Sequence, residues 1–134
     1  MAKAPVLIDS SFYIAASRKG GSPLRTLPYL AMERDLVICG MVRSEVGRGI
    51  KDTALRQDFH DAWDIMLNVT TDNPLWESVE QTAWDLDRHG IVLPIQDIII
   101  ACCAKRAGAV VLTHDRHFLS IPGCKVALTI EELI

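Results

Sequence analysis

The stretch Val6-Leu7-Ile8-Asp9-Ser10-Ser11 decides how the rest of the chain is interpreted. Three apolar residues, two of them β-branched, lead directly into a carboxylate and two hydroxyls. Such a short apolar run is typical of a strand buried on both faces of a parallel sheet. Ser10 or Ser11 suits the N-cap of a helix that begins at once. Asp9 would then lie at the carboxyl end of a central strand, where open α/β sheets bind ligands, unless it merely caps that helix.

Outward from this stretch, apolar runs alternate with segments of helical periodicity. Further strands are predicted at 36–39, 69–71, 109–113 and 125–128. Helices are predicted at 10–16, 23–30, 41–46, from 52 or 53 to about 67, at 74–86 and at 98–107. Strands that alternate with helices predict an α/β sandwich with a mainly parallel sheet.

Length and composition restrict the class of protein. The chain has 134 residues, 49% of them hydrophobic, which predicts one ordered domain over residues 1–134. The longest apolar runs are interrupted by Asp97 and by Lys105-Arg106, so no membrane span is expected. Asp9 follows Lys3 too closely for a signal peptide, and a cytoplasmic protein is expected. The four cysteines lie in apolar surroundings and are interpreted as core residues.

Four acids are expected to meet at one edge of the sheet. Asp9 and Asp115 each follow a predicted strand, Asp97 lies in the first turn of the most apolar helix, and Glu45 lies on the helix after the second strand. Clustered carboxylates repel one another, and a hard divalent cation such as Mg²⁺ or Mn²⁺ relieves that repulsion. Such an ion can activate water and stabilise charge on a phosphodiester. Taken singly, these acids also suit helix caps, a turn and a solvated helix position.

Four segments in order carry a resemblance to a known family. The chain resembles PIN-domain ribonucleases, and most closely the VapC-type toxin of a type II toxin–antitoxin pair. The resemblance extends over essentially the whole chain. The matching segments are Leu7-Ile8-Asp9-Ser10-Ser11, Arg43-Ser44-Glu45-Val46, Gln96-Asp97-Ile98-Ile99-Ile100-Ala101 and Leu112-Thr113-His114-Asp115-Arg116-His117-Phe118.

The resemblance implies a fold, an activity and partners. The fold would be a PIN-like three-layer sandwich with a five-stranded parallel sheet flanked by helices. The activity would be metal-dependent endonucleolytic cleavage of RNA with Mg²⁺ or Mn²⁺. A cognate antitoxin protein and a homodimer are expected partners; the apolar residues of 23–30 and 63–67 suit either a partner helix or a dimer face.

The resemblance also assigns roles to residues of this sequence. Asp9, Glu45, Asp97 and Asp115 would hold the metal, directly or through water, with Ser10, Ser11 and Thr113 as supporting hydrogen-bond donors. Many relatives carry a further acid two residues after the last Asp. This sequence has His117 there, which leaves a second metal position open. His114 and His117 flank Asp115; they are interpreted as parts of a surface turn that leads to Phe118, the alternative being that they bind metal or donate to phosphate.

Basic and aromatic residues give weaker signals. The net charge of −3 disfavours a general nucleic-acid coat protein but not an enzyme with a local basic patch. Arg43, Arg48 and Arg116, together with Lys51 and Arg56, are hypothesised to contact the RNA backbone, the alternative being an ordinary solvated face. Trp63 shares a helical stripe with Phe59 and is expected in the core or an interface.

Competing function classes fit less well. A haloacid-dehalogenase-type phosphatase requires a second acid at position 11, which is Ser11. A phospho-acceptor receiver domain requires a Lys after its last strand, whereas Lys125 precedes that strand. Two alternatives stay open: a PIN-like binding module for RNA or protein without catalysis, and a housekeeping RNA-processing nuclease.

Overall fold

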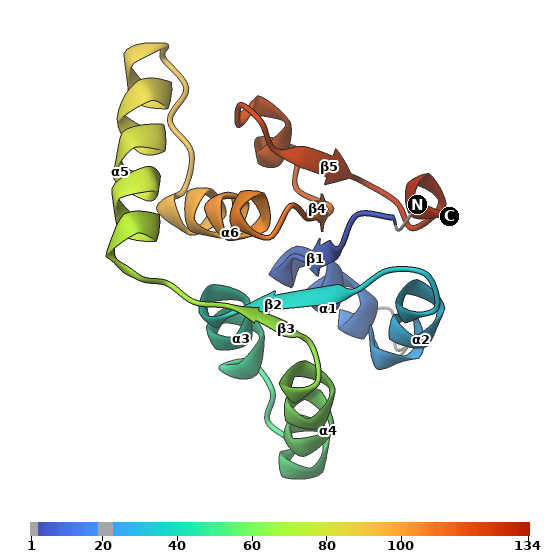
Figure 1. The fold of residues 1–134 in the computed structure, drawn as a ribbon. Coiled ribbons are helices and arrows are strands. Elements are labelled where there is room, and N and C mark those ends of the chain that lie inside the picture. Colours follow the sequence, from blue (N-terminus) through green and yellow to red (C-terminus); the bar gives the residue numbers. More distant parts are fainter. Residues whose placement is uncertain (1–2, 19–22) are drawn as a thin grey trace.

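The computed structural model describes residues 3–18 and 23–134, and within these ranges a five-stranded sheet forms the centre of the molecule (Figure 1). Its order is β3-β2-β1-β4-β5, and all neighbouring strands are parallel. The predicted α/β class and parallel sheet are therefore confirmed. The strands are β1 (Val6–Ile8), β2 (Leu36–Cys39), β3 (Leu67–Val69), β4 (Val110–Leu112) and β5 (Lys125–Ala127).

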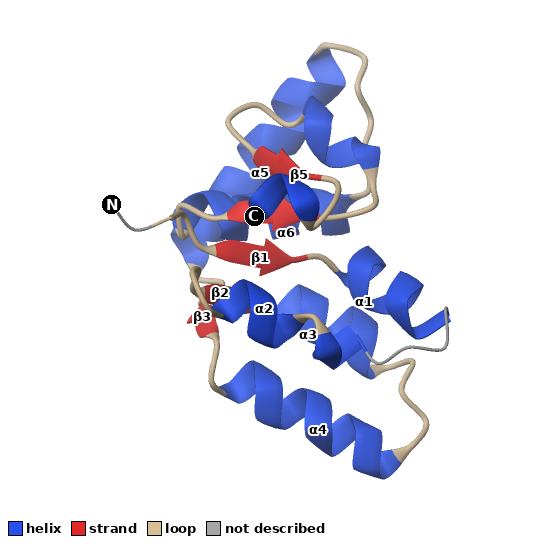
Figure 2. Cartoon of the chain, turned by 90° about the vertical axis from the view of Figure 1, so that its right-hand side faces the viewer, coloured by secondary structure: helices blue, strands red, loops and turns tan. Residues whose placement is uncertain are grey.

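Helices cover both faces of the sheet, in the three layers that were expected (Figures 1 and 2). One face carries α1 (Ser10–Arg18), α2 (Leu27–Ala31), α3 (Gly40–Gly47) and α4 (Thr53–Asp64), and the other carries α5 (Asn73–Arg88) and α6 (Ile95–Arg106). Short 3₁₀ segments occupy Pro23–Arg25, Arg116–Ser120 and Glu131–Leu133. None of the helices in the described ranges combines the length and apolar composition of a membrane span.

The direction in which the chain crosses the sheet reverses between β1 and β4. The chain proceeds from β1 to β2 to β3 on one side, then returns through α5 and α6 to β4 and β5 on the other. Right-handed crossovers therefore place the two sets of helices on opposite faces. Ligands of open α/β sheets bind at the carboxyl edge beside such a reversal.

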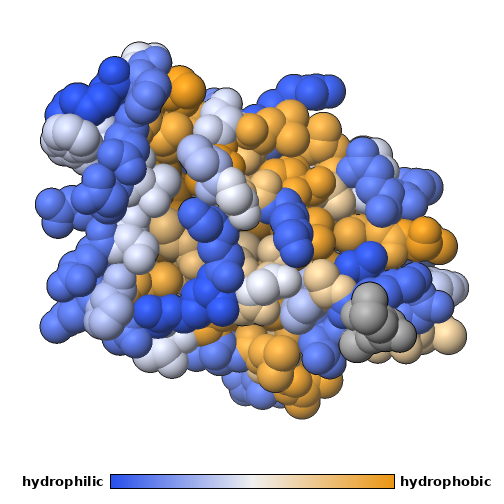
Figure 3. Space-filling view, turned by 45° about the horizontal axis from the view of Figure 1, so that its top comes forward, coloured by the Kyte–Doolittle hydropathy of each residue, from blue (hydrophilic) through white to orange (hydrophobic). Residues whose placement is uncertain are grey.

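The core explains why two stretches of the sequence are so apolar. All residues of β1 are buried, because the sheet is covered on both faces. The seven residues 98–104 of α6 are buried as well, since this helix lies between the sheet and α5. Hydrophilic residues along the left of Figure 3 cover the outer side of α5.

Aromatic and sulfur side chains complete that core. Trp63 is 1% exposed and packs against Phe59 and Tyr13, which confirms its expected place in the core. All four cysteines are free; Cys39, Cys102 and Cys103 are buried and Cys124 is half-buried.

The largest differences from the sequence-based expectation lie between residues 23 and 71. The helix predicted to reach about residue 67 ends at Asp64, and the third strand covers Leu67–Val69 rather than 69–71. The apolar pattern continues past the helix, but the backbone of this segment pairs with β2, Leu67 lying beside Val37. The helix predicted at 23–30 is divided, because Pro28 lacks the N–H that would continue a preceding turn and so lies at the start of α2.

Candidate metal centre

Asp9 is a buried acid at the reversal point of the sheet. Its backbone N–H donates to Leu112 O at 2.9 Å, which continues the ladder between β1 and β4 by one residue. The residue is only 2% exposed. Its Oδ2 accepts hydrogen bonds from Ser11 Oγ at 2.7 Å and from Thr113 Oγ1 at 2.8 Å. A carboxylate can be buried only where such donors replace water.

The two hydroxyls that hold Asp9 are themselves held by the backbone. Ser11 Oγ accepts from the His114 N–H at 3.1 Å, and Thr113 Oγ1 accepts from the Asp115 N–H at 2.9 Å. Each hydroxyl has one proton, which these acceptor roles direct toward Asp9. The backbone turn after β4 therefore fixes the orientation of the Asp9 carboxylate.

Ser10 links Asp9 to Glu45. Its Oγ donates to Glu45 Oε1 at 3.1 Å and lies 3.4 Å from Asp9 Oδ1. Glu45 comes from α3, the helix that follows β2, so its half-buried side chain reaches the same edge of the sheet. Burial raises the pKa of the Glu45 carboxyl and the negative charge of Asp9 adds to the rise, while the hydrogen bond from Ser10 opposes it.

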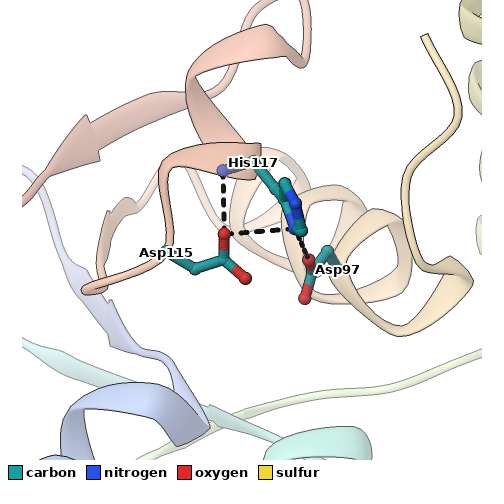
Figure 4. Close-up of side chains that lie close together, drawn as sticks. All are labelled: Asp97, Asp115 and His117. Carbon is teal, nitrogen blue, oxygen red and sulfur yellow. Dashed lines mark hydrogen bonds and ion pairs between the residues drawn. The ribbon is translucent and has the colours of Figure 1, made fainter.

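Asp97, Asp115 and His117 form a second group of side chains that point toward one another (Figure 4). Asp97 lies in the first turn of α6, and Asp115 caps the 3₁₀ segment Arg116–Ser120 by accepting from the His117 N–H at 2.9 Å. The ring atom Nδ1 of His117 lies 3.0 Å from Asp97 Oδ2 and 3.1 Å from Asp115 Oδ1.

The electrostatics connect the two groups. Burial raises the pKa of Asp97 to about 6; the negative charges of Asp115 and Asp9 add to the rise, and the hydrogen bond with His117 opposes it. That hydrogen bond in turn raises the pKa of the His117 imidazole. The negative charge of Asp9 therefore raises the pKa of both Glu45 and Asp97, which links the two groups through Asp9.

The donors at this edge fit a divalent cation. One ligand atom from each of Asp97, Asp115 and His117 lies within 4.8 Å of the other two. Carboxylates that disfavour one another's ionisation are stabilised when a cation is bound among them. Oxygen donors predominate, which is the ligand set that Mg²⁺ and Mn²⁺ take.

The structure brings most of the sequence-predicted residues to this edge. Asp9 and Glu45 are bridged by Ser10, Asp97 and Asp115 are bridged by His117, and Ser11 and Thr113 hold Asp9. His117 lies in a surface turn before the buried Phe118, and its ring also contacts Asp97 and Asp115. The sequence signals for this contact are the nearness of His117 to Asp115 and its position where many relatives carry a further acid.

Three of the arginines that were expected to contact RNA differ in their exposure and in their contacts. Arg43 donates to Asp64 Oδ1 at 3.1 Å and lies 3.1 Å from His60 Nδ1, and its guanidinium lies 5.4 Å from the ring centre of Trp63. These contacts hold Arg43 against α4. Arg48 and Arg116 are exposed.

The raised pKa of Asp97 predicts a pH-dependent stability difference for Asp97→Asn. The folded state holds this proton more tightly than the unfolded chain, so the wild type loses stability as pH rises from about 4 to about 6. An asparagine cannot ionise and avoids this loss. Urea unfolding in chelator is expected to show the free energy of unfolding of the variant rising relative to that of the wild type between about pH 4 and about pH 6 and levelling off above the folded pKa.

Asp58→Asn, which removes an exposed acid of α4, controls for the loss of one negative charge. A difference between Asp97→Asn and wild type that stays constant, or shrinks, as the pH rises would contradict the electrostatic account.

The chain is similar to one protein family and to several solved structures. The family described as PIN domain matches residues 6–123. No curated protein gave a significant match. Among solved structures, VapBC2 from Rickettsia felis bound to a promoter DNA fragment is 20% identical with a TM-score of 0.73, covering 91% of this chain and 96% of that chain.

Two further solved structures are similar over comparable lengths. DNA-bound VapBC from Salmonella typhimurium is 22% identical with a TM-score of 0.68, covering 93% of this chain and 98% of that chain. VapBC-1 from Haemophilus influenzae is 16% identical with a TM-score of 0.70, covering 91% and 96%. These structures share the fold. Since the family match includes every strand except the last together with all four acids, the chain belongs to the PIN domain family.

Proposed function

We propose that the protein is a metal-dependent endoribonuclease that hydrolyses RNA phosphodiester bonds, with Mg²⁺ or Mn²⁺ held by Asp9, Asp97 and Asp115. The observation that carries the proposal is the buried Asp9 carboxylate, held by two oriented hydroxyls at the reversal point of the sheet and close enough to raise the pKa of Asp97. Membership of the PIN domain family supports it.

Some residues of the site would bind the metal ion, and others would orient those ligands and the attacking water. When bound, the ion would supply an activated water and stabilise charge on the scissile phosphate. Asp9 is oriented by Ser11 and Thr113, so its carboxylate needs little rearrangement to bind a cation. Glu45, held through Ser10, would complete the site or orient the attacking water. The Ser10 and Ser11 hydroxyls donate to Glu45 and Asp9 and so support the ligands; no side chain is proposed as a covalent nucleophile.

Positive side chains near this edge would contact the RNA backbone. Arg48 and Arg116 are exposed, and Arg116 directly follows Asp115. Phosphate contacts of this kind contribute affinity without reading sequence. Arg43 would contribute only if RNA binding drew its guanidinium away from Asp64 and Trp63.

The biological role we propose is that of the toxin component of a toxin–antitoxin pair. The three similar solved structures described above are of VapBC, which supports a cognate antitoxin partner; a homodimer of the chain is proposed as well. The four free cysteines suit the reducing cytoplasm, where we place the protein. A housekeeping RNA-processing nuclease is the alternative with the same chemistry.

The enzymatic proposal is tested by incubating the purified protein with a mixed cellular RNA pool in Mg²⁺, in Mn²⁺ and in chelator. We expect cleavage with either ion and none in chelator. Asp115→Asn is expected to reduce the cleavage rate by about two orders of magnitude or more, because the metal loses a ligand while the fold is retained.

Asp58→Asn is the matched control and is expected to cleave at the wild-type rate, since Asp58 is exposed on α4. Equal cleavage by Asp115→Asn and wild type would point to a contaminating nuclease. Absence of both cleavage and metal binding in the wild type would favour the non-catalytic binding module.

The toxin role is tested by induced expression of the chain without a partner in bacterial cells. We expect the wild type to arrest growth within a few doublings and Asp115→Asn at matched protein levels to permit growth, because cleavage of cellular RNA requires the complete site. Normal growth with an active wild-type enzyme would instead support the housekeeping nuclease.

A further inference from the structure

We infer that His117 is a nitrogen ligand of the metal centre and that it makes the site select divalent transition ions such as Mn²⁺ over Mg²⁺. The inference rests on the proposed function, because it concerns the same metal centre. The His117 imidazole lies between two acids. Nδ1 lies 3.0 Å from Asp97 Oδ2 and 3.1 Å from Asp115 Oδ1, between acids contributed by two different segments of the chain (Figure 4).

The local backbone fixes the position of His117. Asp115 accepts the His117 N–H at 2.9 Å and so caps the 3₁₀ segment Arg116–Ser120. The next residue, Phe118, is 0% exposed and anchors the segment in the core. The cap on one side and the anchor on the other fix the Cα of His117 above the first turn of α6. The ring is therefore held at the acids although its side chain is half exposed.

The spacing of the three ligand atoms suits coordination. Adjacent ligands of an octahedral ion with bonds of about 2.1 Å are about 3.0 Å apart. The two nitrogen–oxygen separations, 3.0 and 3.1 Å, have this value, and all three ligand atoms lie within 4.8 Å of one another. A neutral imidazole can carry its proton on Nε2 and offer the Nδ1 lone pair to an ion. The same separations accommodate a hydrogen bond in the free protein.

The choice of ion follows from the chemistry of the donors. Mg²⁺ binds carboxylate and water oxygens and retains several waters. Imidazole nitrogen is a softer ligand that suits first-row transition ions. A site with carboxylates and one imidazole therefore favours Mn²⁺ over Mg²⁺ relative to an all-carboxylate site. Replacing the imidazole by a carboxylate should move the preference back toward Mg²⁺.

The alternative role for His117 is that of a counter-charge. A protonated imidazole between two acids would neutralise them without binding the ion. In that case an added cation would displace the ring, and the nitrogen would be absent from the coordination of Mn²⁺. Spectroscopy of bound Mn²⁺ separates these two roles without any enzymatic assay.

The experiment compares wild type, His117→Asp and His117→Gln by calorimetric titration with Mn²⁺ and with Mg²⁺, in the absence of RNA. Electron-spin-echo spectra of the Mn²⁺-loaded proteins report directly coordinated nitrogen. We expect the wild type to bind Mn²⁺ more tightly than Mg²⁺ and its echo decay to show the modulation caused by a coordinated nitrogen (nitrogen modulation). His117→Asp is expected to lower the ratio of Mn²⁺ to Mg²⁺ affinity about tenfold, and both variants to lose the modulation.

His114→Gln is the matched control. Its ring stacks on Phe12 with ring centres 5.3 Å apart and planes inclined by 16°, away from the group formed by Asp97, Asp115 and His117. This variant should keep the wild-type affinity ratio and the nitrogen modulation. Circular dichroism of each variant verifies folding, and His117→Gln keeps the inference testable should His117→Asp fail to fold.

The experiment distinguishes failure of the ligand role of His117 from failure of the metal centre as a whole. Wild type that binds both ions, shows no nitrogen modulation and has the same affinity ratio as the His117 variants would overturn the ligand role of His117 and leave the nuclease proposal intact. Wild type that binds neither ion would overturn the metal centre and the proposed function with it.

Discussion

The burial of the Asp9 charge is the constraint on which the site depends. A carboxylate that is 2% exposed at the end of a buried strand is tolerated because Ser11 and Thr113 donate to one of its oxygens. The Ser11 donor lies on the same segment as Asp9, whereas the Thr113 donor reaches Asp9 only if β1 and β4 are neighbours in the observed register, which places Ile8 beside Leu112. The geometry of the site therefore depends on the sheet order that makes β1 and β4 neighbours.

A second consequence is electrostatic. The reversal of chain direction between β1 and β4 brings acids from α3, α6 and the turn after β4 to the charge of Asp9. The raised pKa values of Glu45 and Asp97 show that the folded protein disfavours their ionisation. Such a cluster lowers the folding stability of the ion-free protein, as functional sites commonly do. A bound cation would offset this loss of stability.

Much of this arrangement could be predicted from the sequence because burial leaves a strong local signal. The apolar residues of β1 and the seven consecutive buried residues of α6 are recognisable without any tertiary information. An acid directly after such a strand, as at Asp9, then falls at the carboxyl edge by geometry alone. The third strand was displaced in the prediction because Leu67 pairs with Val37, a long-range contact that the helical spacing of the preceding residues conceals.

The orientation of individual side chains was beyond sequence reasoning. His117 faces Asp97 because Asp115 caps the turn and Phe118 anchors it, and three separate contacts must coincide to produce that direction. Arg43 looked equivalent to Arg48 in the sequence, yet one guanidinium is held by Asp64 and Trp63 while the other residue is exposed. Charge and spacing place such residues on a helix or turn but do not predict the direction in which their side chains point.

The central claim is that the carboxyl edge between β1 and β4 is a cation site built around Asp9. The most direct measurement is anomalous X-ray scattering from crystals soaked in Mn²⁺. We expect a strong anomalous peak within coordination distance of Asp9, Asp97 and Asp115, and a weaker peak in crystals of Asp97→Asn. Saturating Mn²⁺ with no peak at this edge, or with the strongest peak elsewhere on the protein, would contradict it.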